Sequence, residues 1–142
     1  MSDRAKRIDE KVFIVAVDFD CTLAEYDHDF KPYVVGEPRP FAIWALQVFK
    51  HNKFEVVLHT NRSNNEILWL WVETHAPGLI DYINEHPKSK CRDFNPGKPP
   101  ADLFIDDRDS RHRGRPVDWV ALLSDLLEEG FLPQGYHSEP VE

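Results

Sequence analysis

Three apolar runs, each followed at once by polar residues, constrain the fold of this chain more than any other feature. The first run, residues 12–17, reads VFIVAV. A β-branched and aromatic run without polar alternation is typical of a parallel strand buried on both faces. Residues 54–58 (FEVVL) and 101–105 (ADLFI) have a similar character. We therefore expect three strands, and the polar groups that follow them are residues 18–22, 60–62 and 106–109.

The segments between these strands predict helices. Pro40 suits the first turn of a helix that runs to about residue 51, because its missing N–H costs nothing there. Ser63 and Glu66 have capping-box spacing and predict a second helix, to about His75. Residues 117–129 predict the last helix. Residues 79–83, between the second and the last of these strands, predict either a further strand, third in chain order, or a helical turn. This order predicts an α/β fold, a Rossmann-like open parallel sheet with helices on both faces.

The domain boundaries follow from length and polarity. A chain of 142 residues is long enough for one domain of ordinary size and too short for two. We expect a polar lead-in at residues 1–11, a single domain at 12–132 and a flexible tail at 133–142. Residues 24–38 are polar and rich in aromatics, and we expect a short flap there. Its Tyr26, Phe30 and Tyr33 would contact the substrate or pack the flap onto the sheet.

Composition limits the class of partner. The formal net charge is −8, whereas nucleic-acid-binding surfaces are usually basic, so nucleic acid is an improbable partner. The two cysteines, Cys21 and Cys91, form no Cys-x-x-Cys pair, and we expect reduced thiols. No apolar run has the length of a signal or membrane segment. We expect a cytoplasmic protein without a membrane partner.

The polar groups themselves predict chemistry on phosphate. Carboxyl ends of parallel strands share one edge of a sheet, where ligands bind, so at least four carboxylates should gather there. Such oxygen ligands suit Mg²⁺ when phosphate is the other ligand. Asp18, the first polar residue after the buried strand, is the candidate nucleophile, and Asp20 the candidate acid/base. Thr60, ahead of a helix, and Lys98 are candidates for binding the phosphoryl group.

The same residues resemble four ordered motifs of the haloacid dehalogenase (HAD) superfamily: DFDCT, HTNR, Lys98 and FIDDRD. The resemblance covers roughly residues 12–119. It implies a small phosphorylated substrate, Asp18 as nucleophile and Asp20 as acid/base. The phosphate-binding residues that it implies are Thr60, Asn61 and Lys98. The Mg²⁺ ligands that it implies are Asp18, the main-chain carbonyl of Asp20, and Asp106, with Asp107 holding the metal shell.

Departures from the family pattern are few. Cys21 occupies a position that is often glycine in the family. Lys88 and Lys90 compete with Lys98 for the lysine motif, and Lys98 is preferred because it lies just ahead of the last strand. The predicted elements fill the gaps between motifs, so the chain resembles the small members that lack a cap domain.

Several functions remain compatible with this pattern. An Mg²⁺-dependent phosphohydrolase that forms an aspartyl-phosphate at Asp18 is favoured. A phosphotransferase or nucleotidase of the same superfamily is the alternative, as is a non-catalytic HAD-like module. A receiver-like phosphate-binding module is disfavoured, because receivers place the acidic pair at the first strand and the lysine last.

Two further segments suggest interactions. Residues 67–72 (ILWLWV) are apolar all round a helix, which favours a homo-oligomer over burial under residues 85–100. Four arginines past the third strand would recognise an anionic substrate or simply pair with acidic neighbours. They are Arg108, Arg111, Arg113 and Arg115.

Overall fold

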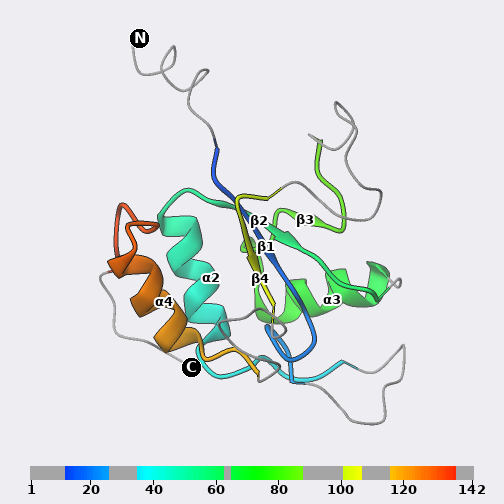
Figure 1. The fold of residues 1–142 in the computed structure, drawn as a ribbon. Helices are drawn as coiled ribbons and strands as arrows, with labels where there is room; N and C mark the ends of the chain where they lie inside the picture. The colour runs from blue at the N-terminus through cyan, green and yellow to red at the C-terminus, as the bar shows by residue number, and fades with distance from the viewer. Residues whose placement is uncertain (1–11, 26–34, 63–64, 88–100, 107–115, 137–142) are drawn as a thin grey trace.

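In the part of the chain that the structure describes, the fold is a four-stranded parallel sheet flanked by three helices (Figure 1). The computed structural model describes residues 12–25, 35–62, 65–87, 101–106 and 116–136. The strands are β1 (Ile14–Val17), β2 (Glu55–Leu58), β3 (Tyr82–Ile83) and β4 (Leu103–Ile105), in the spatial order β3-β2-β1-β4. The helices are α2 (Ala42–His51), α3 (Asn65–His75) and α4 (Trp119–Glu128). This arrangement confirms the predicted α/β class with an open, Rossmann-like parallel sheet.

Burial of β1 on both faces explains its unbroken apolar sequence. Val15 and Val17 are fully buried and belong to the main core, which also contains buried side chains of all three helices. The alternate residues Ile14 and Ala16 are at most 2% exposed. Since successive side chains of a strand point to opposite faces, both faces of β1 are covered. β1 is therefore an interior strand, paired on both sides and covered on both faces.

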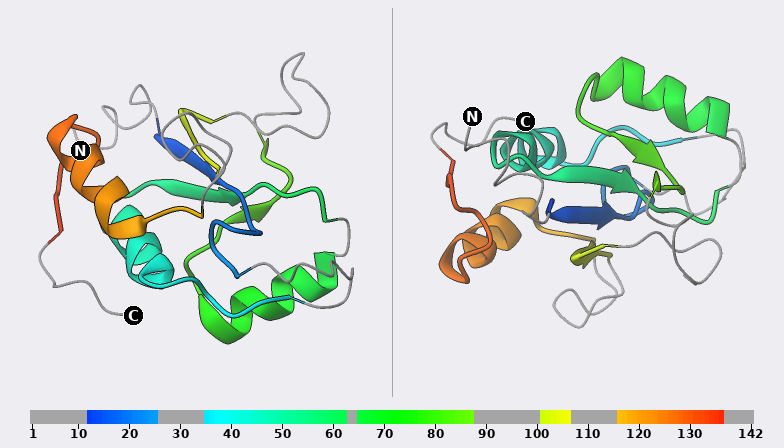
Figure 2. Two further views of the ribbon diagram at one scale, coloured as in Figure 1. Left: turned by 60° about the horizontal axis from the view of Figure 1, so that its bottom comes forward. Right: turned by 90° about the horizontal axis from the view of Figure 1, so that it is seen from above.

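The helices begin and end close to the predicted positions. α2 begins two residues after Pro40, since Phe41 at its N-cap has a φ of 65°, outside the helical region. At α4 the carboxylate of Asp118 accepts a hydrogen bond from the N–H of Ala121 at 3.1 Å, an ordinary N-cap. Helices α2 and α4 lie side by side, as Figures 1 and 2 show, and the rings of Phe49 and Trp119 pack edge to face at 6.2 Å. Ser63 of the expected capping box lies outside the described residues.

The segment at residues 79–83 combines both predicted alternatives. The N–H of Leu79 donates to the carbonyl of Ala76 in a turn after α3. The chain then extends, and only Tyr82 and Ile83 pair with β2. The third strand exists but is two residues long.

The base of the expected flap is a short antiparallel pairing. The N–H of Glu25 donates to the carbonyl of Glu37 at 2.8 Å, and that of Arg39 to the carbonyl of Leu23 at 2.8 Å. A Cβ at Gly36 would lie 2.0 Å from the carbonyl oxygen of Glu25, so only glycine fits there. The indole N–H of Trp71 on α3 donates to the carbonyl of Gly36 at 2.8 Å. Tyr26, Phe30 and Tyr33 lie outside the described residues, so the flap stays a prediction.

Residues 133–136 correct one expectation, because this part of the predicted flexible tail packs against α2. The N–H of Gln134 donates to Oδ1 of Asn52 at 2.7 Å, and Nδ2 of Asn52 donates to the carbonyl of Gly135 at 3.0 Å. The ring of Tyr136 lies edge to face on Trp44 at 5.2 Å. A buried asparagine with two carbonyl partners and one donor partner thus anchors the segment.

The apolar helix α3 divides into a buried and an exposed part. Leu68, Trp71 and Val72 are at most 3% exposed, whereas Trp69 is 36% and Leu70 65% exposed. The expected partial exposure is confirmed, and the homo-oligomer remains a prediction. None of the described helices is long and apolar enough to cross a membrane.

Candidate functional site

The sheet topology brings Asp18 and Asp106 to neighbouring strand ends. From β1 the chain continues to β2 and β3 on one side, and β4 lies on the other side of β1. Val17 pairs with Ile105, and the N–H of Asp18 donates to the carbonyl of Ile105 at 2.9 Å. Such a reversal of strand order is where open α/β sheets bind ligands. The two aspartates that the sequence predicted to lie together therefore follow adjacent strands at the same edge of the sheet.

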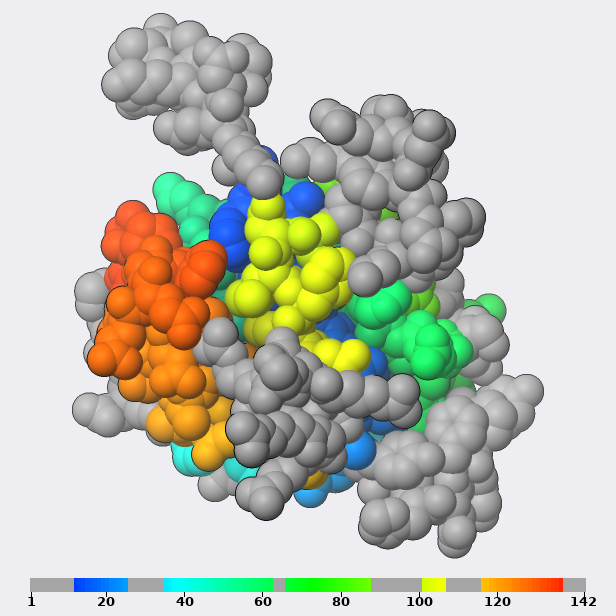
Figure 3. Space-filling view, in the orientation of Figure 1, coloured from blue at the N-terminus to red at the C-terminus, as the bar shows by residue number. Residues whose placement is uncertain are grey.

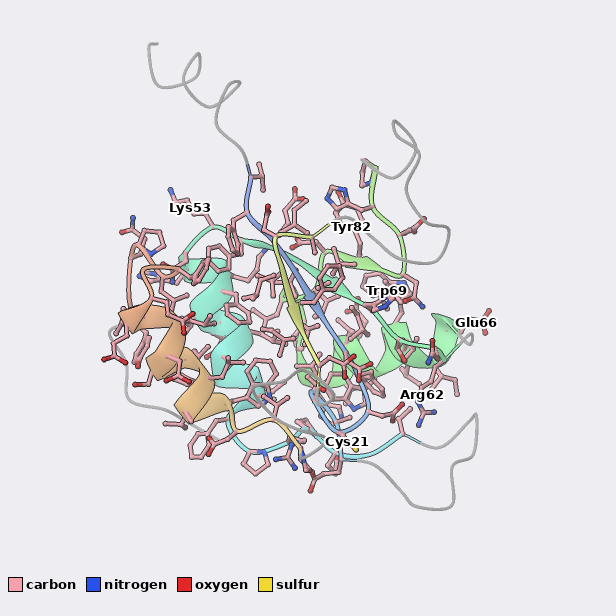
Figure 4. The ribbon with its side chains drawn as sticks, in the orientation of Figure 1. Cys21, Lys53, Arg62, Glu66, Trp69 and Tyr82 are labelled. Atoms are coloured by element: carbon pink, nitrogen blue, oxygen red, sulfur yellow. The ribbon has the colours of Figure 1, made fainter. Side chains whose placement is uncertain are left out.

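The end of β2 adjoins the same place. The N–H of His59 donates to the carbonyl of Val17 at 2.8 Å, so Thr60 follows β2 directly beside the end of β1. Figure 4 shows Cys21 and Arg62 at this end of the sheet, with Lys53 at the opposite end. β4 is an edge strand, and Figure 3 shows it on the surface beside α4. The three predicted polar groups thus start at one edge of the sheet.

A tight turn after β1 orders the first polar group. The carbonyl of Phe19 accepts hydrogen bonds from the N–H groups of Thr22, Leu23 and Ala24 at 3.2, 2.9 and 2.9 Å. The ring of Phe19 is fully buried and packs edge to face on Trp71 at 5.0 Å. Asp18 and Asp20, on either side of this anchored ring, are both partly exposed.

Cys21 has the backbone conformation that favours glycine. Its φ is 64°, and its N–H donates to the carbonyl of Ala24 at 2.9 Å. Its carbonyl accepts from the N–H of Val117 at 3.2 Å, which ties the turn to the start of α4. Left-handed backbone costs a side-chain-bearing residue roughly 1–2 kcal/mol. The cysteine therefore stands where the turn itself calls for glycine, as the family pattern implied.

Arg62 holds the carboxylate of Asp20 by both oxygens. Its Nε donates to Oδ2 at 2.8 Å and its Nη2 to Oδ1 at 2.9 Å. The side chain of Arg62 is 6% exposed and that of Asp20 21%, so this bidentate pair is largely shielded from water. The guanidinium also lies 5.7 Å from the centre of the Phe19 ring. The site, which the sequence predicted to be mainly acidic, therefore also contains the fixed guanidinium of Arg62.

Thr60 is buried, and its side chain shapes the loop after β2. Its Oγ1 accepts a hydrogen bond from the N–H of Arg62 at 3.2 Å, and its own N–H donates to Oδ1 of Asn84 at 2.9 Å. The hydroxyl keeps a proton with which to donate to a bound anion. Asn61, between the two, is exposed. The loop therefore presents Thr60 and Asn61 beside the end of β1.

Thr22 supports the turn through its backbone. Its carbonyl accepts a hydrogen bond from the indole N–H of Trp119 at 2.7 Å. Its hydroxyl is fully buried with no hydrogen-bond partner among the residues that the structure describes. The buried Trp119 thus joins the start of α4 to the turn.

The oxygen groups at this edge fit a small hard cation. Asp18 and Asp106 supply carboxylates at adjoining strand ends, and Mg²⁺ commonly takes one or two carboxylates together with waters and phosphate. The carboxylate of Asp20 is engaged by Arg62, so Asp20 would contribute only its main-chain carbonyl. Within the described ranges no three acidic, histidine or cysteine side chains form a complete metal cluster. Asp107 and Lys98, which completed the predicted set, lie outside those ranges.

Sequence reasoning missed three residues of this site. Arg62 was part of the HTNR group without a role, although an arginine among aspartates is a natural bidentate partner. Asn84 lies far along the chain from Thr60, and no local pattern pointed to it. Trp119 fell within the helix predicted at residues 117–129, and nothing in the sequence pointed to its hydrogen bond to Thr22.

Comparisons with known proteins add a structural relative. No protein-family model matches the chain, and no curated protein matches it. A solved structure of a conserved protein, coded by a locus from Bacteroides thetaiotaomicron, superposes with a TM-score of 0.63. The two chains are 29% identical over 91% of this chain and 100% of that one. The likeness supports the fold, and that protein's description states no activity.

Proposed function

We propose that this protein is an Mg²⁺-dependent phosphohydrolase of the HAD type, acting on a small phosphorylated substrate through an aspartyl-phosphate at Asp18. The observation that carries the proposal is the backbone hydrogen bond from Asp18 to Ile105. It brings the candidate nucleophile beside Asp106, the candidate metal ligand, at the reversal of strand order. Phosphoryl transfer at this position would use the polar groups at all three strand ends.

The proposed reaction has two displacements. In the first, an Asp18 oxygen attacks phosphorus and the bond to the leaving oxygen breaks. In the second, water attacks phosphorus and restores the Asp18 carboxylate. Mg²⁺, when bound, would neutralise phosphoryl oxygens and align them for in-line attack. Asp18 and Asp106 would hold the ion.

The remaining residues would bind and orient the phosphoryl group. Thr60 offers a hydroxyl and Asn61 a backbone N–H at the start of the segment that leads into α3. Asp20 occupies the position that the resemblance assigns to the acid/base. Lys98 is the proposed cation for phosphate, and Asp107 the proposed support of the metal shell.

The alternatives predict different products. A phosphotransferase would pass the phosphoryl group to an acceptor other than water, and a nucleotidase would release phosphate from nucleotides. A non-catalytic or receiver-like module would bind Mg²⁺ and phosphate without turnover. The reversal of strand order places two carboxylates where a ligand binds, which all of these functions share. Analysis of the reaction products distinguishes them.

The test is hydrolysis of p-nitrophenyl phosphate with and without Mg²⁺, followed by Asp18→Asn. We expect release of p-nitrophenol and inorganic phosphate only with Mg²⁺, and a loss of about 10³-fold or more in Asp18→Asn. Circular dichroism of the variant shows whether it is folded. A folded Asp18→Asn that keeps the wild-type rate contradicts the proposal.

Self-association and a cytoplasmic location are predictions from the sequence. The exposed pair Trp69 and Leu70 would form the contact between copies. A monomeric mass in solution at micromolar concentration would contradict that contact.

A further inference from the structure

The loop after β2 is held by a side chain from the neighbouring strand β3. β2 ends at Leu58, and the next two N–H groups bond to opposite sides. The N–H of His59 donates to the carbonyl of Val17 on β1 at 2.8 Å. The N–H of Thr60 donates to Oδ1 of Asn84 at 2.9 Å. Asn84 follows β3 directly, so its carboxamide oxygen takes the place that a main-chain carbonyl of a longer β3 would fill.

The backbone of Asn84 allows this bond. Its own N–H donates to the carbonyl of Leu58 at 2.8 Å, which continues the pairing of β3 with β2. Its φ is 56°, in the left-handed region that asparagine tolerates better than most residues with a side chain. Asn84 therefore continues β3 through its main chain and extends β2 through its side chain.

The chain beyond Asn84 is anchored to the same two strands. His86 is 4% exposed, and its Nε2 lies 2.6 Å from Oε1 of Glu55, the first residue of β2. The ring of His86 packs edge to face on Tyr82 of β3 at 4.9 Å. The residues on both sides of Asn84 are therefore packed in place, and the carboxamide is fixed with them.

Thr60 is consequently held by its main chain and its side chain at once. Its N–H is bonded to Asn84, and its Oγ1 accepts a hydrogen bond from the N–H of Arg62 at 3.2 Å. A threonine hydroxyl can donate its proton while it accepts such a bond. Because the N–H is engaged, the hydroxyl is the group through which Thr60 can donate to an anion.

We propose, on the basis of the phosphohydrolase function above, that Asn84 is a positioning residue for the phosphoryl group. It fixes the main chain of Thr60 and thereby directs the threonine hydroxyl to a phosphoryl oxygen beside the end of β1. Asn84 itself does not touch the substrate. Groups that are held in place before binding lose less freedom when the ligand arrives, so removal of the carboxamide should weaken phosphate binding.

The first experiment measures the dissociation constant of orthophosphate with Mg²⁺ by calorimetry, for the wild type and for Asn84→Gly. Glycine adopts a φ of 56° freely, so the change removes only the carboxamide. We expect binding to weaken by about tenfold, as for the loss of a hydrogen bond to a charged group. Lys53→Gly is the matched control, because it makes the same change at a φ of 65° at the opposite end of the sheet. It should keep the wild-type affinity, and a folded Asn84→Gly that also keeps it overturns the proposal.

The second experiment repeats the titrations in Thr60→Val, which removes the hydroxyl and keeps the N–H that Asn84 holds. Thr60→Val alone should weaken phosphate binding by about tenfold or more. Adding Asn84→Gly should then weaken it by less than about threefold, because the group that Asn84 positions is gone. A loss of about tenfold in both backgrounds would mean that Asn84 contacts phosphate directly or supports the site only in a general way. Either meaning overturns the positioning role.

The outcomes separate this inference from the proposed function. Turnover of p-nitrophenyl phosphate with unchanged phosphate affinity in Asn84→Gly leaves the function standing and overturns the role of Asn84. Orthophosphate binding without turnover in the wild type contradicts the phosphohydrolase, and the two titrations still decide for Asn84. A wild type that binds no orthophosphate with Mg²⁺ contradicts both.

A measurement on the wild type covers the case in which Asn84→Gly does not fold. The amide of Thr60 should be protected from hydrogen exchange before orthophosphate is added, because Asn84 already accepts its proton. Exchange as fast as that of an unbonded amide overturns the proposal.

Discussion

The two ends of the same sheet both carry aspartates, and they use them differently. At the amino end, Asp81 precedes β3 and Asp102 precedes β4. At the carboxyl end, Asp18 follows β1 and Asp106 follows β4. β4, a strand of three residues, is therefore flanked by one aspartate of each kind.

At the amino end the carboxylates complete the hydrogen bonding of the strands. Oδ2 of Asp102 accepts from the N–H of Ile14 at 2.8 Å. Oδ2 of Asp81 accepts from the N–H of Val56 at 2.8 Å and from Nζ of Lys50 at 2.7 Å. Ile14 is the first residue of β1 and Val56 the second of β2, and these aspartates stabilise the fold by supplying acceptors for their N–H groups.

At the carboxyl end the backbone supplies its own partners. The N–H groups that leave β1, β2 and β3 donate to carbonyls of the neighbouring strands, from Asp18 to Ile105, from His59 to Val17 and from Asn84 to Leu58. The carboxylates of Asp18 and Asp106 are not needed to satisfy those groups. An aspartate before a strand thus completes the hydrogen bonding of this sheet, and the backbone takes over that role after a strand.

Asp106→Asn should have the largest effect on activity. We expect the Mg²⁺ concentration for half-maximal hydrolysis of p-nitrophenyl phosphate to rise about 10- to 100-fold or more. Asp102→Asn at the other end of β4 is the matched control and should keep the wild-type Mg²⁺ dependence. Equal Mg²⁺ dependence in both variants would contradict the distinction between the two ends.

Asp81→Ala should have the reverse effect. It leaves the N–H of Val56 without its acceptor, which should lower the free energy of unfolding by about 2 kcal/mol. The midpoint of thermal unfolding should fall by roughly 5–10 °C. Below that temperature kcat/KM should match the wild type. A drop in kcat/KM without a change in the unfolding midpoint would contradict a structural role.

Cys21→Gly should raise stability slightly without changing the reaction. Relief of a φ of 64° is worth about 1–2 kcal/mol, and the added freedom of the unfolded chain offsets about half of it. We expect a net gain of about 0.5–1 kcal/mol in chemical denaturation. Lys53→Gly, with a φ of 65° at the amino end, is the matched control and should gain a similar amount. A loss of stability in Cys21→Gly would mean that its thiol makes a stabilising contact.

Lys50→Gln should have the smallest effect. The side chains of Lys50 and Asp81 are 28% and 31% exposed, and such an ion pair contributes about 0.5 kcal/mol. Comparison with Asp81→Ala in the same denaturation assay separates the ion pair from the hydrogen bond to Val56. Equal losses of unfolding free energy in the two variants would mean that the ion pair of Lys50, and not the hydrogen bond to Val56, accounts for the stability.

Much of the fold could be predicted from the sequence, because burial leaves a strong local pattern. The run at residues 12–17 predicted β1 since a strand covered on both faces cannot alternate. Once the strands were taken as parallel, Asp18 and Asp106 had to end at one edge. The two-residue β3 was ambiguous because its length falls below any periodic pattern.

The rest of the structure depends on side-chain contacts between distant segments, which local sequence patterns do not encode. Arg62 reaches Asp20 because the side chain of Thr60 bends the loop between β2 and α3. Residues 133–136 pack on α2 because Asn52 lies within reach of their backbone. Both contacts join segments distant in sequence, whereas local polarity predicted a flexible tail and assigned no role to Arg62.

The central position of β1 has a consequence for how the protein is made. β1 is synthesised before the other strands of this sheet, yet its N–H at Ile14 bonds to Asp102, 88 residues later in the chain. Pairings of such long sequence separation are slow to form, and an unpaired apolar strand invites aggregation until they do. Asp18 therefore has no Asp106 beside it until the residues of β4 have been synthesised, so a chain that stops before β4 should lack the proposed activity.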